Sequence, residues 1–147
     1  MVFAIDVAKG AGAALLGGGH VPTALAAGAA SILGHVFSPL AGFKGGRGVA
    51  TSLGVFLALL PIPALLALAV WVDLCVTSRH VAIGSIGAAL LYPAFVAWLA
   101  PEDGYRTAYL VAAILVAALV VIRHIPNIRR LMAGTEQATF GGKRAKP

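Results

Sequence analysis

The residues best suited to chemistry form a glycine-rich stretch, residues 34–51, which reads G-H-V-F-S-P-L-A-G-F-K-G-G-R-G-V-A-T. Its glycines let the backbone fold tightly and turn N–H groups toward an anion, and Lys44 and Arg47 add positive charge. An apolar segment begins where the stretch ends, and the N-terminus of a helix also favours phosphate. We therefore predict a phosphate-binding loop, whose binding residues are His35, Lys44, Gly45, Gly46, Arg47, Gly48 and Thr51.

Two other interpretations of this stretch fit its residues less well than a phosphate-binding loop. The nucleotide pattern G-x-x-x-x-G-K-[ST] does not fit, because Arg47-Gly48-Val49 stands where Gly-Lys-Ser/Thr would fall, so ATP or GTP binding is not supported. A flexible loop that only places positive charge on the cytoplasmic side would need neither the glycines nor His35.

A second group, residues 124–136, follows the last apolar segment and reads H-I-P-N-I-R-R-L-M-A-G-T-E. Pro126 suits the first turn of a helix and Gly134 suits its end, which predicts a short surface helix. An imidazole at this interface can exchange protons or hold a phosphoryl or carbonyl oxygen, so His124 is a candidate for catalysis. Arg129 and Arg130 could instead have no role beyond contact with lipid headgroups.

A third and weaker group, residues 78–85, reads S-R-H-V-A-I-G-S and occupies another turn. Arg79 could clamp a phosphate, with Ser85 about two turns into the following helix, or Arg79 could only snorkel to the membrane surface. Asp73 is an acid in an apolar run, which is costly unless it is paired, and we expect it to be structural with a partner such as Arg79. His20 lies in an opposite turn and is assigned no role.

Several classes of protein are excluded by pattern. The chain has no H-E-x-x-H motif, no carboxylate pair near the basic stretches and no G-x-S-x-G elbow, so neither a metallohydrolase nor a serine hydrolase is indicated. The net charge of +6 arises from basic residues that flank apolar runs and gather after Val121, which is typical of a membrane surface rather than of nucleic-acid binding. The lone Cys75 allows no intramolecular disulfide.

The elements that position these groups are apolar. Of the 147 residues, 60% are hydrophobic and 11% are charged, whereas soluble domains carry about 25% charged residues. Breakers divide the chain into about six apolar segments, the first of which we expect to start near Val2. The segments are residues 10–16, 24–37, 48–60, 64–76, 81–99 and 108–122.

Lys and Arg fall in alternate connections between these segments, which predicts that the basic connections and both chain ends are cytoplasmic. Ala, Gly and Ser recur along the segments and permit close helix packing in lipid. We therefore predict an all-α, polytopic transmembrane helix bundle with a glycine-rich cytoplasmic loop. It would form one domain over residues 1–140, followed by a disordered basic tail over residues 141–147.

Together these motifs resemble those of the bacterial acyl-phosphate:glycerol-3-phosphate acyltransferases. The pattern G-H-x-F-x-x-x-x-x-F-K-G-G-[KR]-G-V-A-T is met from Gly34 to Thr51, and H-x-x-N-I-x-R-L-x-x-G-x-E is met from His124 to Glu136. Residues 6–10, D-V-A-K-G, resemble the D-x-x-K-G that opens the family's second helix. The resemblance covers nearly the whole chain.

The resemblance implies an enzyme of phospholipid synthesis in the bacterial plasma (inner) membrane, with its site facing the cytoplasm. It would transfer a fatty acyl group from acyl phosphate to the sn-1 hydroxyl of glycerol 3-phosphate, giving lysophosphatidic acid and phosphate without a cofactor or metal. It also implies that His124 and Asn127 support acyl transfer and that Glu136 is structural. Membrane lipids would be its other partners, with no nucleic acid, and the sequence does not indicate an oligomeric state.

Two departures from the family pattern leave an alternative open. Where the family has T-R-Y-x-S-x-x-S, residues 78–85 replace the Tyr and the first Ser by His80 and Ala82. The family's first helix and its S-G-N-x-G-A-T-N loop have no counterpart in these residues, so we expect either a start site placed too late or a real loss. With a real loss, the chain would be a catalytically inactive remnant or a small transporter that binds phosphorylated solutes.

Overall fold

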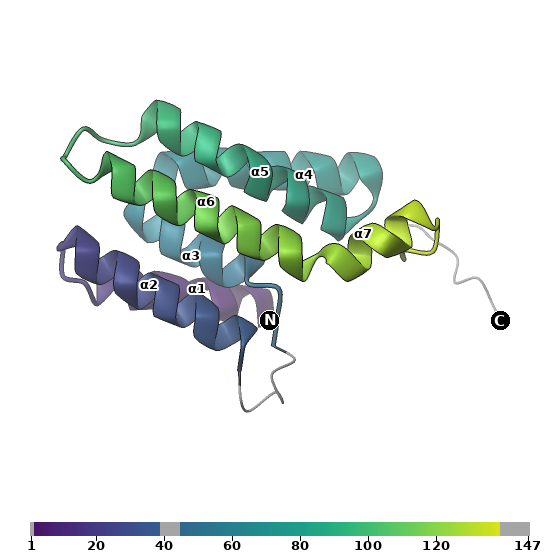
Figure 1. Ribbon diagram of the computed structural model, residues 1–147, viewed down its shortest axis with the longest axis horizontal. Coiled ribbons are helices and arrows are strands. Elements are labelled where there is room, and N and C mark those ends of the chain that lie inside the picture. The colour runs from purple at the N-terminus through teal and green to yellow at the C-terminus, as the bar shows by residue number, and fades with distance from the viewer. Residues whose placement is uncertain (1, 39–44, 139–147) are drawn as a thin grey trace.

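The structure, a computed structural model, describes residues 2–38 and 45–138. All regular structure in these ranges is helical, which confirms the predicted fold class (Figure 1). The predicted tail at residues 141–147 lies outside the described residues. The helices are α1 (Val2–Leu15), α2 (Val21–Val36), α3 (Val49–Leu59), α4 (Pro61–Ser78), α5 (Val81–Leu99), α6 (Arg106–Arg123) and α7 (Ile125–Met132).

The helix boundaries follow the breakers in the sequence. Each of the six predicted apolar segments coincides with one of α1 to α6, and α1 starts at Val2 as expected. Pro61 is the first residue of α4, and Pro126 lies in the first turn of α7. Proline has no N–H, but in the first turn of a helix an N–H would have no acceptor within the helix, so no hydrogen bond is lost. The predicted short helix after His124 is confirmed as α7.

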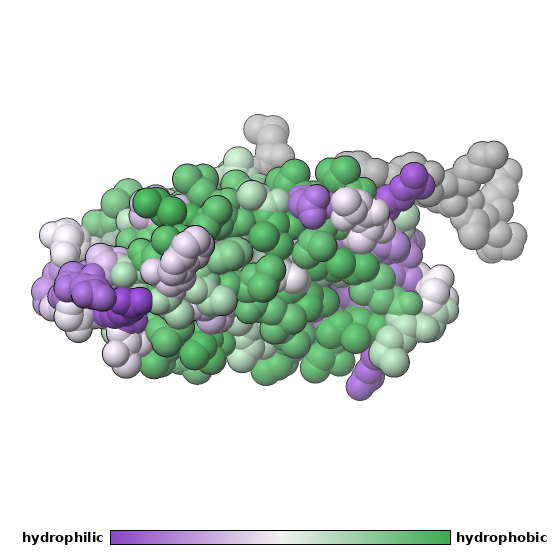
Figure 2. Space-filling view, turned by 90° about the horizontal axis from the view of Figure 1, so that it is seen from above, coloured by the Kyte–Doolittle hydropathy of each residue, from purple (hydrophilic) through white to green (hydrophobic). Residues whose placement is uncertain are grey.

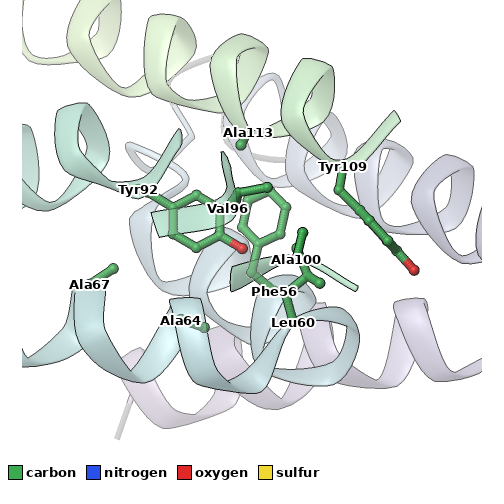
Figure 3. Close-up of a cluster of buried hydrophobic side chains, with 9 residues drawn as sticks. All are labelled: Phe56, Leu60, Ala64, Ala67, Tyr92, Val96, Ala100, Tyr109 and Ala113. Carbon is green, nitrogen blue, oxygen red and sulfur yellow. The ribbon is translucent and has the colours of Figure 1, made fainter. Parts of the chain in front are cut away.

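The helices pack in two groups, α1 to α3 and α4 to α6 (Figure 1). One buried apolar cluster joins Phe56 of α3 to Tyr92 and Val96 of α5 and to Ala113 of α6 (Figure 3). Within the first group, α1 and α3 touch backbone to backbone, since a Cβ on Gly54 would overlap the carbonyl of Val7. Such close packing drives helix association in lipid, where side chains gain nothing by leaving an equally apolar solvent.

The bundle is apolar on its outside and lined by small residues inside. Leu65, Leu90 and Leu115 are exposed, whereas Ala64 and Ala113 are buried. Figure 2 shows hydrophobic residues over the middle of one face and hydrophilic residues gathered toward the two ends. A surface of this kind fits a bilayer, whose hydrocarbon core meets the apolar middle.

Helix length varies among the six predicted segments. α4, α5 and α6 have 18, 19 and 18 residues and are long and apolar enough to cross a membrane, because about 27 Å of helix approaches a hydrocarbon core of about 30 Å. α2 and α3 are apolar but shorter, with 16 and 11 residues. In the described ranges, three of the predicted segments therefore reach the length of a full span.

One end of the bundle collects the three groups singled out in the sequence. The N-terminus of α1 and the whole of α7 lie at this end, as do the last turn of α2 and the start of α3 (Figure 1). At the opposite end Arg106 donates a hydrogen bond of 2.8 Å to Glu102. The up-and-down course of the chain thus brings distant stretches of sequence to one place.

Candidate functional site

A cavity that carries five polar side chains in a largely apolar wall, here called the polar cavity, lies at the end of the bundle where α7 begins. It is bounded by α1, the end of α2, residues 46–50, the start of α5 and the junction of α6 with α7, and it encloses about 810 Å³ of empty space, part of it continuous with solvent. The structure therefore brings residues of all three predicted groups to one cavity. The predicted site residues that line it are His35, Gly46, Arg47, Gly48, Ser85 and His124.

Residues 45–48 form a non-helical segment packed against the last turn of α2. A Cβ on Gly45 would overlap the carbonyl of His35, and a Cβ on Gly46 would overlap its ring. The guanidinium of Arg123 donates to the carbonyls of Gly45 at 3.0 Å and Gly46 at 3.4 Å. Gly48 has φ of 81°, a left-handed conformation that favours glycine, and it caps α3. These contacts hold the segment in one orientation ahead of α3.

The N-terminus of α3 opens on this cavity. Val49 and Ala50 line it, and the first N–H groups of a helix have no acceptor within the helix. Together with the guanidinium of Arg47, they make a place suited to a phosphate group. Thr51 is fully buried and does not line the cavity, and Lys44 lies outside the described residues.

Asp6 also lines the cavity, although no role was predicted for it. Its Oδ1 lies 3.3 Å from Nδ1 of His35, and both side chains are only 18% exposed. A carboxylate beside one ring nitrogen favours a proton on that nitrogen and fixes the orientation of the ring. The other nitrogen, Nε2, faces Gly46, where the lack of a side chain leaves room for it.

His124 is fully buried at the junction of α6 and α7 and borders the cavity. Its Nδ1 lies 2.7 Å from the carbonyl oxygen of Val120, and a carbonyl only accepts, so Nδ1 carries the proton in the neutral ring. Nε2 has no hydrogen-bond partner among the described residues and therefore keeps a free lone pair. This is the arrangement that a general base requires.

The electrostatic surroundings of His124 also favour a base. Burial lowers the pKa of His124 because desolvation disfavours the charged imidazolium, and the positive charge of Arg47 lowers it further. The Val120 carbonyl and the Glu136 carboxylate act in the opposite direction but do not outweigh burial. The ring is thus kept neutral at physiological pH.

Asn127 does not line the cavity and instead braces α7. Its side-chain amide donates to Oε1 of Glu136 at 2.5 Å, and Nε of Arg130 donates to Oε2 at 2.6 Å. Burial would raise the pKa of the Glu136 carboxyl, but these two hydrogen bonds and the nearby positive charges hold that pKa below its usual range. The brace ties residue 136 to α7, which begins directly after His124.

The third predicted group contributes one residue to the cavity. The hydroxyl of Ser85 accepts a hydrogen bond of 3.2 Å from the indole of Trp71 and can still donate its own proton. Arg79 is exposed, ends α4 with φ of 63° and does not line the cavity. Asp73 is also exposed, and in the part of the chain that the structure describes no ion pair joins it to Arg79.

An almost entirely apolar cavity continues from the polar one into the bundle. Phe3, Val49, Trp71 and Ser85 line both cavities, so the two share a boundary. The apolar cavity runs between α3, α4, α5 and α6 and encloses about 590 Å³ of empty space, part of it open to the outside. The polar cavity, which His124 borders, and the apolar cavity therefore meet at these four residues.

The family model described as "Glycerol-3-phosphate acyltransferase" matches residues 1–134. The chain belongs to the glycerol-3-phosphate acyltransferase family. The family resemblance read from the motifs is thereby confirmed.

Members of the glycerol-3-phosphate acyltransferase family are similar to this chain at high identity. A glycerol-3-phosphate acyltransferase of Trichlorobacter lovleyi is 49% identical over 109 residues, which cover 74% of this chain and 54% of that protein. One of Geobacter sulfurreducens is 47% identical over 115 residues, which cover 78% of this chain and 57% of that protein. The chain thus spans about half the length of these curated relatives.

Solved structures agree with the fold. Crystal structures of PlsY (YgiH), described as an integral membrane glycerol 3-phosphate acyltransferase, are 38% identical to this chain with a TM-score of 0.84. The match covers 95% of this chain and 70% or 71% of those chains, which represent a glycerol 3-phosphate form and a lysophosphatidic acid form. The prediction of an integral membrane bundle is confirmed by this likeness.

Proposed function

We propose that this chain carries the site of an enzyme that transfers a fatty acyl group from acyl phosphate to the sn-1 hydroxyl of glycerol 3-phosphate. The observation that carries the proposal is one cavity bordered by a buried imidazole with a free Nε2, a guanidinium and a helix N-terminus. The likeness to PlsY in its glycerol 3-phosphate and lysophosphatidic acid forms supports the same substrate and product here.

The phosphate of glycerol 3-phosphate would bind at the start of α3. There Arg47 and the free N–H groups at the start of α3 border the cavity, which His35 and Ser85 also line as further polar contacts. The positive charges of Lys44 and Arg79 would attract anionic substrates to the protein. The acyl transfer needs no nucleophile from the protein, because acyl phosphate is already an activated mixed anhydride.

The transfer step needs one base and one anion site. His124 Nε2 takes the proton of the sn-1 hydroxyl while its oxygen attacks the acyl carbonyl carbon. A C–O ester bond forms, the bond between that carbon and the phosphate oxygen breaks, and phosphate leaves with the electron pair. Arg47 stabilises the departing charge, and the proton returns from His124 to phosphate. Asn127 supports this step through the brace that holds α7 in place.

We place the protein in the bacterial plasma membrane with the polar cavity facing the cytoplasm, because Lys and Arg gather at that end. A reporter fused after Arg130 should therefore give a cytoplasmic signal. A reporter inserted at Gly104, in the connection between α5 and α6, should give an external one. Paired alkaline phosphatase and green fluorescent protein fusions measure both, and a cytoplasmic signal from Gly104 would contradict the arrangement.

The pH dependence of transfer should report His124. Transfer requires the neutral ring, so the rate is full above the pKa of His124 and is lost as pH falls through it. Because that pKa is lowered, the acid limb of kcat/KM should lie below the ordinary histidine value of about 6.5. Glu136→Gln removes a charge that raises this pKa and should move the limb to lower pH.

Arg129→Gln is the matched control for Glu136→Gln, because Arg129 is exposed on α7 and is not among the groups that shift the pKa of His124. It should leave the acid limb in place. A limb that stays unchanged in Glu136→Gln, or that lies above the ordinary histidine range in the wild type, would remove His124 as the titrating base.

The proposed function is tested by following labelled glycerol 3-phosphate into lysophosphatidic acid in membranes that contain this chain. The same assay is run on an extended chain, preceded by the helix and S-G-N-x-G-A-T-N loop that the family resemblance implies, and on the Trichlorobacter lovleyi relative as a positive control. We expect product with palmitoyl phosphate and none with palmitoyl-CoA. Glycerol 3-phosphate binding without transfer by either form would instead favour a remnant or transporter.

A further inference from the structure

Arg123 binds the glycine-rich segment without bordering the polar cavity. It is the last residue of α6, and its guanidinium donates to the carbonyl oxygens of Gly45 at 3.0 Å and Gly46 at 3.4 Å. Gly46 and Arg47 line the cavity, whereas Arg123 does not. The guanidinium therefore holds the carbonyls of this segment from outside the cavity.

The geometry of the peptide group relates these carbonyls to the N–H groups that follow them. The described peptide bonds are all trans, and in a planar trans peptide the C=O of one residue and the N–H of the next point in opposite directions. The N–H groups of Gly46 and Arg47 therefore point away from Arg123. In the described ranges neither N–H donates a hydrogen bond to the protein. Successive N–H groups of this kind can bind an anion.

The glycines make this orientation depend on a contact. Because Gly45 and Gly46 carry no side chains, the peptide groups beside them can rotate at little steric cost. A rotated peptide group would present its carbonyl oxygen to the cavity, where it would repel a phosphate. Such a rotation breaks the hydrogen bonds from Arg123. Hydrogen bonds in a chain also polarise one another, so a carbonyl bound to a guanidinium makes the N–H of the same peptide group a stronger donor.

We infer that Arg123 is a positioning residue for the phosphate of glycerol 3-phosphate, because it turns the N–H groups of Gly46 and Arg47 toward that phosphate. The inference rests on the proposed function. It adds two backbone donors, and the residue that orients them, to the Arg47 guanidinium and the N-terminus of α3. Arg123 directly precedes His124, so one junction both orients the phosphate site and carries the proposed base.

The first test is kinetic. Arg123→Gln is expected to raise the KM for glycerol 3-phosphate about tenfold or more and to change kcat less, because phosphate loses correctly oriented donors while His124 remains. A merely structural role would reduce the amount of folded enzyme, which lowers the apparent kcat and leaves KM unchanged. Arg123→Lys keeps the charge without the planar fork and should give an intermediate KM. Initial rates of labelled lysophosphatidic acid formation in extended-chain membranes measure both constants.

Arg129→Gln is the matched control for Arg123→Gln. It removes the same charge at the same end of the bundle, but in the part of the chain that the structure describes Arg129 makes no hydrogen bond to Gly45 or Gly46. Its KM should equal that of the wild type. An unchanged KM in Arg123→Gln would overturn the inference, and a KM raised equally in both variants would do so as well, since charge alone would explain it.

The second test observes the N–H groups directly and does not depend on catalysis or on a variant that folds. Gly46-Arg47 is the one Gly-Arg pair in the sequence. Protein with ¹³C in the glycine carbonyl and ¹⁵N in the arginine backbone therefore gives a single carbonyl-filtered amide signal, that of Arg47. Glycine labelled with both isotopes gives the second residue of each Gly-Gly pair, which are Gly18, Gly19, Gly46 and Gly142.

Spectra of this chain in lipid nanodiscs are compared with and without saturating glycerol 3-phosphate. The amide proton signals of Gly46 and Arg47 should move downfield, as expected for N–H groups that bind a phosphate oxygen. Gly18 and Gly19 are internal controls, because they lie in the turn between α1 and α2 at the other end of the bundle, and their signals should stay in place (Figure 1). The Gly46 signal is identified by its absence in Gly46→Ala.

The outcomes separate the inference from the proposed function. Downfield shifts that occur in the wild type and are lost in Arg123→Gln support the inference, and would do so even if no form of the chain transferred an acyl group, in which case only the proposed function fails. Signals of Gly46 and Arg47 that do not respond overturn the inference, whether or not labelled product is formed. Equal shifts in Arg123→Gln and the wild type also overturn it, because the N–H groups would then face the phosphate without Arg123.

Discussion

Replacing His124 by alanine is expected to lower kcat for acyl transfer by about 10²-fold or more, with the protein still folded and inserted in the membrane. The reason is geometric, because Nδ1 is held by the Val120 carbonyl and Nε2 is the unpartnered nitrogen that borders the cavity. Labelled glycerol 3-phosphate, with extended-chain membranes adjusted to equal amounts of each variant, measures the effect.

His20→Ala is the matched control for His124→Ala, because His20 is an exposed histidine in the turn at the other end of α2. It should retain wild-type kcat. Asn127→Ala should also lower kcat, through loss of the hydrogen bond to Glu136 that braces α7. Near wild-type turnover in His124→Ala would take the imidazole out of the mechanism and leave the site to the glycine-rich loop.

The fold was largely predictable because lipid makes local sequence decisive. Every backbone group in a bilayer must be paired within its own segment, so apolar runs become helices and breakers become their ends. This is why Pro61, Pro126 and the glycines before α2 mark boundaries correctly. α3 is short, with 11 residues where the sequence predicted a segment over residues 48–60, and residues 45–48 directly before it are non-helical. Such backbone is tolerated at depth where it lines a cavity, as residues 46–48 do.

The positions of candidate site residues were predictable where those residues belong to one continuous motif at a helix end. The glycine-rich stretch correctly places Arg47 and Gly48 at the start of a helix that faces the cavity. The spacing of the motif did not show that Thr51 lies outside the cavity lining. The packing of α1 on α3 decides which face of α3 is covered. Spacing also could not show that Asn127 faces Glu136, since the chain bends at His124 between α6 and α7.

Contacts between distant stretches were beyond the sequence alone. Asp6 stands in the D-V-A-K-G stretch, and Arg123 directly precedes His124, but neither position reveals a partner. The structure pairs Asp6 with His35 and joins Arg123 to the carbonyl of Gly45, 78 residues away. Both contacts support the segment that carries the proposed phosphate site. The residues that position this segment could therefore be identified only from the folded structure.

Gly46→Ala is expected to raise the KM for glycerol 3-phosphate about tenfold or more, the loss that follows when one hydrogen bond to a charged group is broken. A Cβ on Gly46 would overlap the ring of His35, so either the ring leaves Asp6 or residues 45–48 move away from the N-terminus of α3. Initial rates of labelled lysophosphatidic acid formation, measured over a range of glycerol 3-phosphate concentrations, give KM and kcat separately.

Two comparisons show whether the effect of Gly46→Ala is this steric one. Gly34→Ala is the matched control, because a Cβ there meets nothing within contact distance and the residue belongs to the same motif, so its KM should be unchanged. In a His35→Ala background the overlap is relieved, and Gly46→Ala should then raise KM far less than it does alone, which a double-mutant cycle measures as coupling. Equal effects in both backgrounds would mean that the added methyl acts on the phosphate directly rather than through His35. An unchanged KM in Gly46→Ala itself would mean that residues 45–48 only connect α2 to α3 and do not bind the phosphate.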